Sequence, residues 1–152
     1  MSRRKGRILA FQGVYSWDVS KSSVEDILKF SWLQKDSAEE EKEPEAQSLA
    51  PELLEERTFA SLIITGTIEH IQEIDELIKN HLSENWTLER INKVSLAILR
   101  TSIFEMKFQN GSQPKIVIDE AVNIAREYGL EDSYKFINAV LDKIGKDEPK
   151  RA

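Results

Sequence analysis

A cluster of positive charge lies at the amino-terminal end of the chain. Four of the first seven residues are basic, and no acidic residue occurs before Asp18. Cationic side chains can contact the phosphates of a nucleic acid, so a polyanion is the first ligand class to consider. The cationic cluster consists of Arg3, Arg4, Lys5 and Arg7.

The rest of the chain carries the opposite charge. The net charge is −6, and residues 8–152 carry −10 because they lack these four cations. Overall attraction cannot bring an acidic protein to a polyanion, so the local cluster indicates a specific contact. A charged extension without a binding role is the alternative, and the cluster alone does not decide between the two.

Aromatic and basic side chains near the other end provide a second candidate contact. Tyr128, Lys135 and Phe136 belong to two carboxy-terminal helices that we expect to form a hairpin. Single-stranded RNA is bound by aromatic stacking together with cationic phosphate contacts. Phe136 also falls on the apolar side of its helix with Ile137 and Val140, so core packing is an equally open role for it.

The chain lacks the residue patterns of the common enzyme classes, and the single residues that could belong to such patterns occur without the rest of the pattern. The chain has no cysteine, no glycine-rich phosphate loop, no nucleophile elbow and no helix with paired metal-binding histidines. His70 and His81 lack a third ligand, and the helix dipole explains the adjacent acids Asp119 and Glu120. We therefore expect no catalytic activity, no metal, no cofactor and no small-molecule substrate.

The sequence also predicts the cellular compartment. The absence of cysteine fits a reducing environment. No apolar run approaches the roughly 18 residues of a membrane span, and the amino terminus lacks the apolar core of a signal peptide. We expect a cytoplasmic protein that makes no membrane contact.

Apolar residues recur at three- and four-residue spacing, which predicts helices along most of the chain. The helix at 51–83 has an apolar stripe long enough to be the central packing element, and the helix at 93–109 is apolar enough to be buried between others. The fold prediction is all-α, a single domain over residues 1–152 with about six or seven helices. The predicted helices cover 4–19, 23–34, 51–83, 93–109, 115–128 and 133–144, with a short helical turn at 86–91.

Residues at the helix ends predict specific caps. Ser22 with Glu25 has the pattern of a capping box, and Asn92 and Ser133 are suited to cap the helices that follow them. Gly129 fits the position after a helix, where a left-handed backbone is common.

An acidic segment separates the second and third predicted helices. Residues 36–56 contain nine acids and one base, and almost nothing between 36 and 48 could be buried. This composition predicts a mobile loop at about 36–50. A solvated connector is the simple interpretation, and a decoy that competes with RNA for the cationic cluster is the alternative.

Several segments resemble the NusB family of bacterial transcription antitermination factors. They match it in order and spacing, with the carboxy-terminal segments the most specific. The resemblance covers essentially the whole chain except the acidic segment. The matching segments are residues 3–7, 10–12, 15–17, 99–105, 114–121, 128–129 and 132–143.

The resemblance implies two packed three-helix units and a non-enzymatic role in antitermination. It implies pairing with NusE, a ribosomal small-subunit protein, and binding of boxA-type RNA within the transcription elongation complex, notably on rRNA operons. Tyr15 matches a tyrosine of the NusE-facing surface. The RNA-binding residues implied by the matching motifs are Arg3, Arg4, Lys5, Arg7, Tyr128, Asp132, Lys135 and Phe136.

Two positions depart from the family pattern. Ser95-Leu96 stands where an acid followed by a base is usual, in the region implied to face NusE, and Ala139 stands where a glycine is usual. Two other functions stay open, a protein-interaction module without an RNA role and an accessory domain of an rRNA cytosine-5 methyltransferase. The chain ends after the last predicted helix, so we expect the free-standing factor.

The resemblance joins the two candidate contacts into one composite RNA surface. We expect its amino-terminal half to be exposed and only partly ordered without RNA, and its specificity to come from the other half and from NusE. Exposed charges contribute little to folding. Replacing Arg3, Arg4 and Arg7 should therefore reduce RNA affinity with little loss of stability.

Overall fold

The computed structural model describes residues 3–34, 50–109 and 113–146. Within these ranges the chain forms seven α-helices, two short 3-10 helices and no strand, which confirms the all-α prediction. The acidic loop predicted at about 36–50 lies outside the described residues, apart from Ala50.

The described residues form the following helices in chain order. The α-helices are α1 (Arg3–Ser20), α2 (Val24–Ile27), α3 (Pro51–Glu69), α4 (Ile71–Asn80), α5 (Lys93–Lys107), α6 (Pro114–Tyr128) and α7 (Ser133–Lys146). The 3-10 helices are η1 (Ser31–Gln34) and η3 (Leu88–Arg90).

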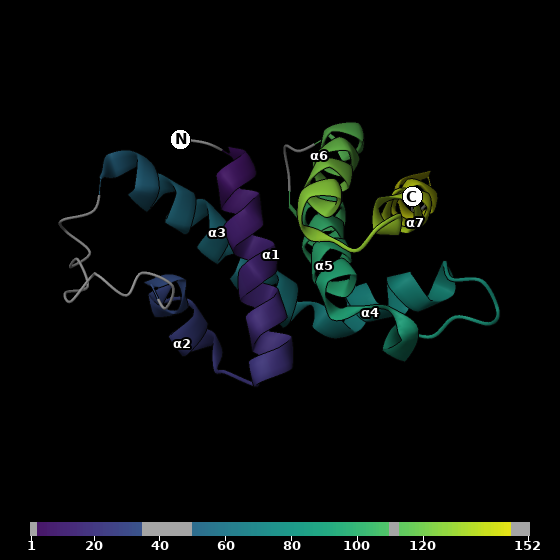
Figure 1. Ribbon diagram of the computed structural model, residues 1–152, viewed down its shortest axis with the longest axis horizontal. Helices are drawn as coiled ribbons and strands as arrows, with labels where there is room; N and C mark the ends of the chain where they lie inside the picture. Colours follow the sequence, from purple (N-terminus) through teal and green to yellow (C-terminus); the bar gives the residue numbers. More distant parts are fainter. Residues whose placement is uncertain (1–2, 35–49, 110–112, 147–152) are drawn as a thin grey trace, which may run out of the picture.

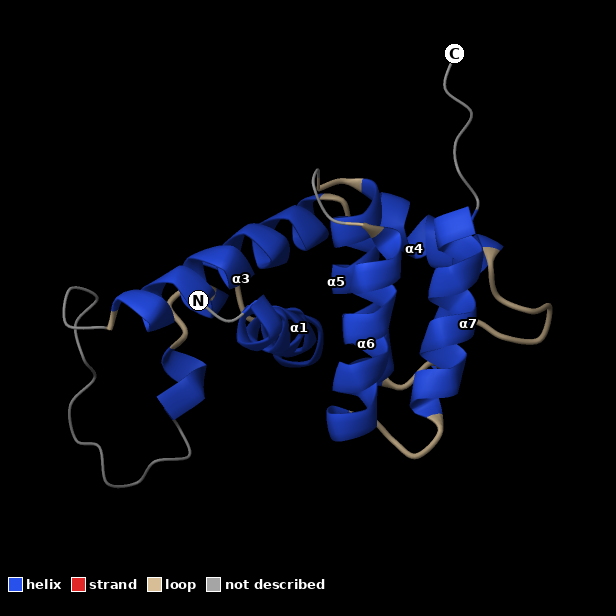
Figure 2. Cartoon of the chain, turned by 90° about the horizontal axis from the view of Figure 1, so that it is seen from above, coloured by secondary structure: helices blue, strands red, loops and turns tan. Residues whose placement is uncertain are grey.

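The helices form two packed groups. Helices α1, α2 and α3 make up the first group, and α5, α6 and α7 form a three-helix bundle (Figures 1 and 2). Helix α1 joins the groups because it packs against both α3 and α5, and α4 lies against α5. This arrangement agrees with the two three-helix units that the family resemblance implies.

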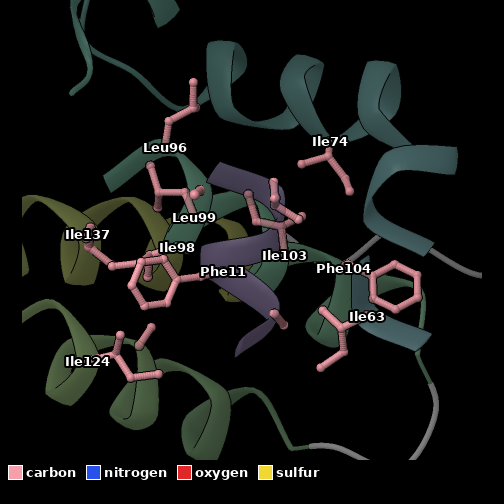
Figure 3. Packing of buried hydrophobic residues seen from close by; sticks show 14 of the residues in the cluster. Phe11, Ile63, Ile74, Leu96, Ile98, Leu99, Ile103, Phe104, Ile124 and Ile137 are labelled. Atoms are coloured by element: carbon pink, nitrogen blue, oxygen red, sulfur yellow. The ribbon is translucent and has the colours of Figure 1, made fainter. Parts of the chain in front are cut away.

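Helix α5 is the central packing element. Every residue from Ser95 to Glu105 is buried, because other helices surround α5 on all sides. The expectation that the helix at 93–109 is buried is confirmed, whereas the central role predicted for 51–83 is wrong. Figure 3 shows side chains of α5 meeting Phe11 of α1, Ile63 of α3 and Ile124 of α6. Each buried side chain of this size stabilises the fold by about 1.5–3 kcal/mol.

Two glycines allow the first helical group to pack closely. A Cβ atom on Gly13 of α1 would lie 2.5 Å from Cδ1 of Ile64, and one on Gly66 of α3 would lie 2.1 Å from Cζ of Phe104. Both distances are far shorter than any van der Waals contact. The missing side chains therefore let α1 pack on α3 and let the Phe104 ring of α5 pack on α3.

The segment predicted as a helix over 23–34 is broken. Helix α2 ends at Ile27, and Phe30 adopts a left-handed backbone with φ of 58°. The turn allows both Ile27 and Phe30 to be buried, and the Trp32 indole donates a hydrogen bond to the Ile27 carbonyl at 2.9 Å. The cap is also shifted by one residue, because Ser23 Oγ accepts from the Asp26 amide.

The predicted helix 51–83 is two helices that meet at His70. The backbone of His70 (φ −106°, ψ 22°) ends α3 and begins α4. Its ring stacks on Phe108 with centroids 4.2 Å apart, and its Nδ1 lies 2.8 Å from Oε1 of Glu73. Hydrophobic periodicity misses the break because α3 and α4 each bury residues at helical spacing on either side of it.

The remaining cap predictions have mixed outcomes. Asn92 caps α5 as predicted, since its Oδ1 accepts from the Ser95 amide at 2.9 Å. Ser133 is the first residue of α7 rather than its cap, and its hydroxyl has no partner among the described residues. Gly129 is extended (φ −90°, ψ 176°), and the left-handed residue before α7 is Asp132. Helix α7 continues past Gly145 to Lys146.

Candidate nucleic-acid interface

Arg7 is buried and ion-paired rather than part of an exposed cluster. Only 9% of the residue is accessible, and its Nε donates to Glu105 at 2.9 Å (Oε1) and 3.1 Å (Oε2). Because α1 is helical from Arg3, position 7 shares a face with the buried residues Phe11 and Val14. The expectation that all four cations are exposed is therefore wrong for Arg7, which joins α1 to α5.

The other three cations are exposed at the start of α1. The Arg3 guanidinium lies 5.6 Å from the ring centroid of Phe59 on α3, and Arg4 Nη2 lies 3.6 Å from Oε1 of Glu127 on α6. Arg3 and Arg4 thus contact different neighbours of α1, and Lys5 follows them on the same turn. Residues 3–7 are helical, so the expectation of a partly ordered backbone there is wrong.

Tyr128 lies close to this part of the molecule. The residue is 41% exposed, and its ring meets Phe11 of α1 edge-on, with centroids 5.6 Å apart and planes at 64°. The preceding residue, Glu127, forms the ion pair with Arg4. The structure therefore brings one exposed aromatic residue and one exposed cation of the predicted set to the same helix pair, α1 and α6.

Phe136 is neither fully buried nor fully exposed. It packs against the core cluster and tilts over Trp86 with ring centroids 5.7 Å apart. It lines an open groove of about 220 Å³ with Trp86, Leu130 and Asp132. Both roles considered from the sequence, core packing and an RNA contact, are compatible with this half-buried position.

Lys135 lies in a different groove from Phe136. Adjacent helix positions point about 100° apart, and Lys135 lines the groove between α6 and α7. Its Nζ lies 3.6 Å from Oδ1 of Asp132, and both side chains are exposed. The predicted cluster of Tyr128, Lys135 and Phe136 is thus spread over three sides of the α6–α7 pair, which the sequence did not indicate.

The position implied to face NusE is partly accessible. Tyr15 on α1 is 36% exposed. Ser95 is buried, with 1% of the residue accessible, and its hydroxyl has no partner among the described residues. The serine at this departure from the family pattern therefore lies inside the protein rather than on its surface.

Arg100, the basic residue of the central motif, has a structural function. Arg100 donates two hydrogen bonds to Asp75 of α4, each 2.9 Å long, and its Nη1 lies 3.4 Å from Oδ2 of Asp18 on α1. Lys93 Nζ approaches the same oxygen of Asp18 at 3.4 Å. This network ties α1, α4 and α5 together. A charged residue on a largely apolar helix is the sequence signal for such a buried partner.

Arg126, which is exposed, and Tyr134, which is partly buried, are residues that the sequence reasoning missed. The Arg126 guanidinium lies 4.5 Å from the ring centroid of Tyr134, so a cation of α6 stacks on an aromatic ring of α7. Spacing along the chain does not reveal this pair because it forms across two helices. The detectable signal was a basic residue in the last turn of a helix facing an aromatic residue of its hairpin partner.

Metal-binding clusters and membrane-spanning helices are both absent from the described ranges. Residues 3–34, 50–109 and 113–146 contain no group of three or more His, Cys, Asp or Glu side chains able to hold a metal ion. None of the helices in those ranges is long and apolar enough to cross a membrane.

Comparison with known proteins gives a consistent result. Residues 4–146 match the NusB family. The transcription antitermination protein NusB of Treponema denticola is 44% identical over 95% of this chain and 96% of its own. T. maritima NusB has a TM-score of 0.74 at 28% identity, covering 97% of this chain and 92% of that one. A crystal structure of antitermination factors NusB and NusE in complex with dsRNA has a TM-score of 0.75 at 26% identity, and the match covers 96% of this chain and 97% of that one.

Proposed function

The chain belongs to the NusB family, and we propose that it is an antitermination factor that binds boxA-type single-stranded RNA together with NusE. In this proposal it joins the transcription elongation complex in the cytoplasm and supports processive transcription of rRNA operons. It acts by binding and positioning RNA, without catalysis or a cofactor.

The supporting observation is the arrangement of Arg4, Glu127 and Tyr128 where α1 meets α6. Proteins bind single-stranded RNA through cationic side chains that contact phosphates and aromatic rings that stack on bases. Here an exposed guanidinium and an exposed aromatic residue lie on neighbouring helices. The Arg4–Glu127 pair is half-exposed on both sides, at 46% and 55%. Such a pair contributes little to stability, so RNA phosphate can replace the carboxylate at low cost.

The NusE part of the proposal has separate support. A structural relative at 26% identity is a NusB in complex with NusE and RNA, and Tyr15 of this chain is accessible on α1. The Treponema denticola relative is matched over almost its whole length. A match of that extent to an antitermination protein favours an antitermination role over a role in rRNA methylation.

Binding measurements with defined oligonucleotides test the proposal. The chain is titrated with boxA-type RNA, a scrambled RNA of the same composition and a duplex form of each, with and without NusE, over a series of salt concentrations. We expect preference for the single-stranded boxA sequence when NusE is present, with a log–log salt slope of about −0.7 for each phosphate contacted. Equal affinity for the boxA and scrambled RNAs in the presence of NusE would falsify the sequence-specific part.

A protein-interaction module without an RNA role is the second candidate. The observation that favours it is an open apolar groove of about 560 Å³ on α3, lined by Pro51, Leu54, Phe59 and Leu62 among others. Leu54 and Leu62 are 45% and 60% exposed. A stable complex with NusE combined with no RNA binding under any condition of the same titration would establish this candidate instead.

A further inference from the structure

We propose that the cationic end of the groove between α6 and α7 binds a phosphodiester of the RNA, with Arg126 as the phosphate-binding residue and Tyr134 as its platform. The inference rests on the proposed RNA-binding function and adds a contact to it. It assigns a role to two residues outside the set that the sequence motifs indicated.

The α6–α7 groove is built from side chains suited to a nucleotide. Its volume is about 480 Å³, and its lining runs from Asp119 to Arg126 on α6 and from Tyr134 to Asn138 on α7. Both helices contribute cations and amides, which can contact phosphate oxygens, sugar hydroxyls and base edges. The lining residues are Asp119, Val122, Asn123, Arg126, Tyr134, Lys135 and Asn138.

Arg126 has unused hydrogen-bonding capacity in a fixed position. It is exposed, and among the described residues it forms no hydrogen bond and no ion pair. A guanidinium carries five N–H donors in a planar fork that matches the oxygens of a phosphate. Stacking at 4.5 Å on the Tyr134 ring holds this fork in place, so less conformational entropy is lost when an anion binds.

Lys135 supplies a second positive charge at the same ring. Its Nζ lies 6.0 Å from the centroid of Tyr134, so two cations approach one aromatic side chain. Their mutual repulsion falls when an anion binds beside them. The present partner of Lys135 is Asp132 at 3.6 Å, in a pair whose side chains are 67% and 69% exposed. A surface pair of this kind can be exchanged for a phosphate at little cost.

The groove has a charge gradient that selects where RNA can cross it. Asp119 lies seven residues before Arg126, which is two helical turns or about 10 Å along α6. The acid makes the far end unfavourable for a polyanion, so the strand crosses at the end marked by Arg126 and Lys135. This end of the groove lies near Tyr128, because Arg126 and Tyr128 both belong to the last turn of α6. Arg126 contacts α7, and Tyr128 contacts α1. One RNA strand passing over that turn reaches both.

Charge-matched variants test the assignment. Arg126→Ala is compared with Lys79→Ala, which removes the same charge from α4, where Lys79 pairs only weakly with Glu76 at 3.6 Å. Affinity for boxA-type RNA is measured with NusE over a salt series. We expect Arg126→Ala to weaken binding about tenfold, the effect of losing charge-assisted hydrogen bonds. The salt slope should also fall by about 0.7, and Lys79→Ala should change neither.

Two further variants separate charge from geometry. Arg126→Lys keeps the charge and loses the planar fork, so the salt slope should persist while affinity falls. Tyr134→Leu keeps both cations and removes the aromatic platform. It should weaken RNA binding only because Arg126 is no longer held in position. In an Arg126→Ala background, Tyr134→Leu should therefore add little.

The outcomes distinguish this inference from the proposed function. If the unmodified chain shows no preference for boxA RNA, the proposed function fails and this contact fails with it. If the unmodified chain binds selectively but Arg126→Ala behaves like Lys79→Ala, the groove assignment alone is overturned. A direct readout needs no variant. The Arg126 Nε–H resonance of the unmodified chain should shift when RNA is added, and an unmoved resonance at saturation would overturn the assignment.

Discussion

The guanidinium of Arg7 and the carboxylate of Glu105 form an ion pair inside the protein, 98 residues apart in the chain and 2.9 Å apart in space. Their side chains are 10% and 3% exposed. One residue belongs to the amino-terminal cationic motif and the other to the central motif of α5. Arg7, although it belongs to the motif that resembles an RNA-binding one, therefore holds α1 against α5. This packing in turn positions the exposed cations that precede Arg7 in the helix.

Removing Arg7 should destabilise the protein strongly. Arg7→Ala leaves the Glu105 carboxylate buried without its partner, which typically costs about 3–5 kcal/mol in the free energy of unfolding. Arg3→Ala, at an exposed position of the same helix, should change it by about 0.5 kcal/mol or less. Urea denaturation measures both. Equal stabilities for the two variants would show that the Arg7–Glu105 pair contributes nothing to the fold.

Neutralising Glu127 should strengthen RNA binding. The Glu127 carboxylate occupies Arg4 at 3.6 Å and competes with phosphate for it. Glu127→Gln removes this competitor, whereas Arg4→Ala removes the cation, so their effects on affinity should have opposite signs. Both residues are about half-exposed, so stability should hardly change in either variant. Weaker binding by Glu127→Gln would show that the carboxylate does not compete with phosphate, and unchanged binding by Arg4→Ala would show that Arg4 does not contact RNA.

Substitution of Phe136 should affect both stability and binding. Phe136 packs on Trp86 and on the core, so Phe136→Ala should cost about 1–3 kcal/mol, less than the 3–5 kcal/mol of a fully buried phenylalanine. Phe136→Leu keeps most of the apolar contact and loses the ring, so it should preserve stability better while still weakening RNA binding. Urea denaturation and RNA titration of both variants separate the two roles. Unchanged RNA affinity in a folded Phe136→Leu variant would assign Phe136 to packing alone.

A methyl group at position 66 should disrupt the contact between α3 and α5. In Gly66→Ala the new Cβ would overlap the Phe104 ring, with the nearest atom at 2.1 Å, and overpacking of this kind costs about 1–3 kcal/mol. Gly145→Ala is the matched control, because the nearest atom there lies 3.6 Å away. That variant should stabilise α7 by up to about 1 kcal/mol through higher helix propensity. Thermal melting compares the two, and similar melting temperatures would mean that Phe104 relocates without cost.

Tyr15 should be required for NusE binding more than for folding. It is 36% exposed on α1, and Val19, one turn further on, is 46% exposed. Tyr15→Ala should weaken the NusE complex by an amount that Val19→Ala does not, while both variants keep the stability of the unmodified chain. Calorimetric titration with NusE gives the affinities. An equal effect of the two substitutions would place the NusE contact elsewhere.

The sequence by itself determined the helical class, the approximate extent of α1, α5, α6 and α7, and the family. Helical periodicity and a cap such as Asn92 depend on residues three to seven positions apart, so they can be read from a local stretch of chain. The family motifs likewise depend on order and spacing alone. Among the site residues, Arg4 and Tyr128 are exposed in the structure, and their contact with RNA stays a prediction.

Only the tertiary structure decided which charged and aromatic residues are available to a ligand. In the folded protein Arg7 is buried against Glu105, and the predicted helix 51–83 is interrupted at His70. Lys135 and Phe136 line different grooves, and Arg126 stacks on Tyr134. Each outcome depends on a partner from another helix, whose approach is set by how the helices pack together. The physical reason is that helix formation is governed by local spacing, whereas the burial and pairing of a side chain are governed by what lies across the interface.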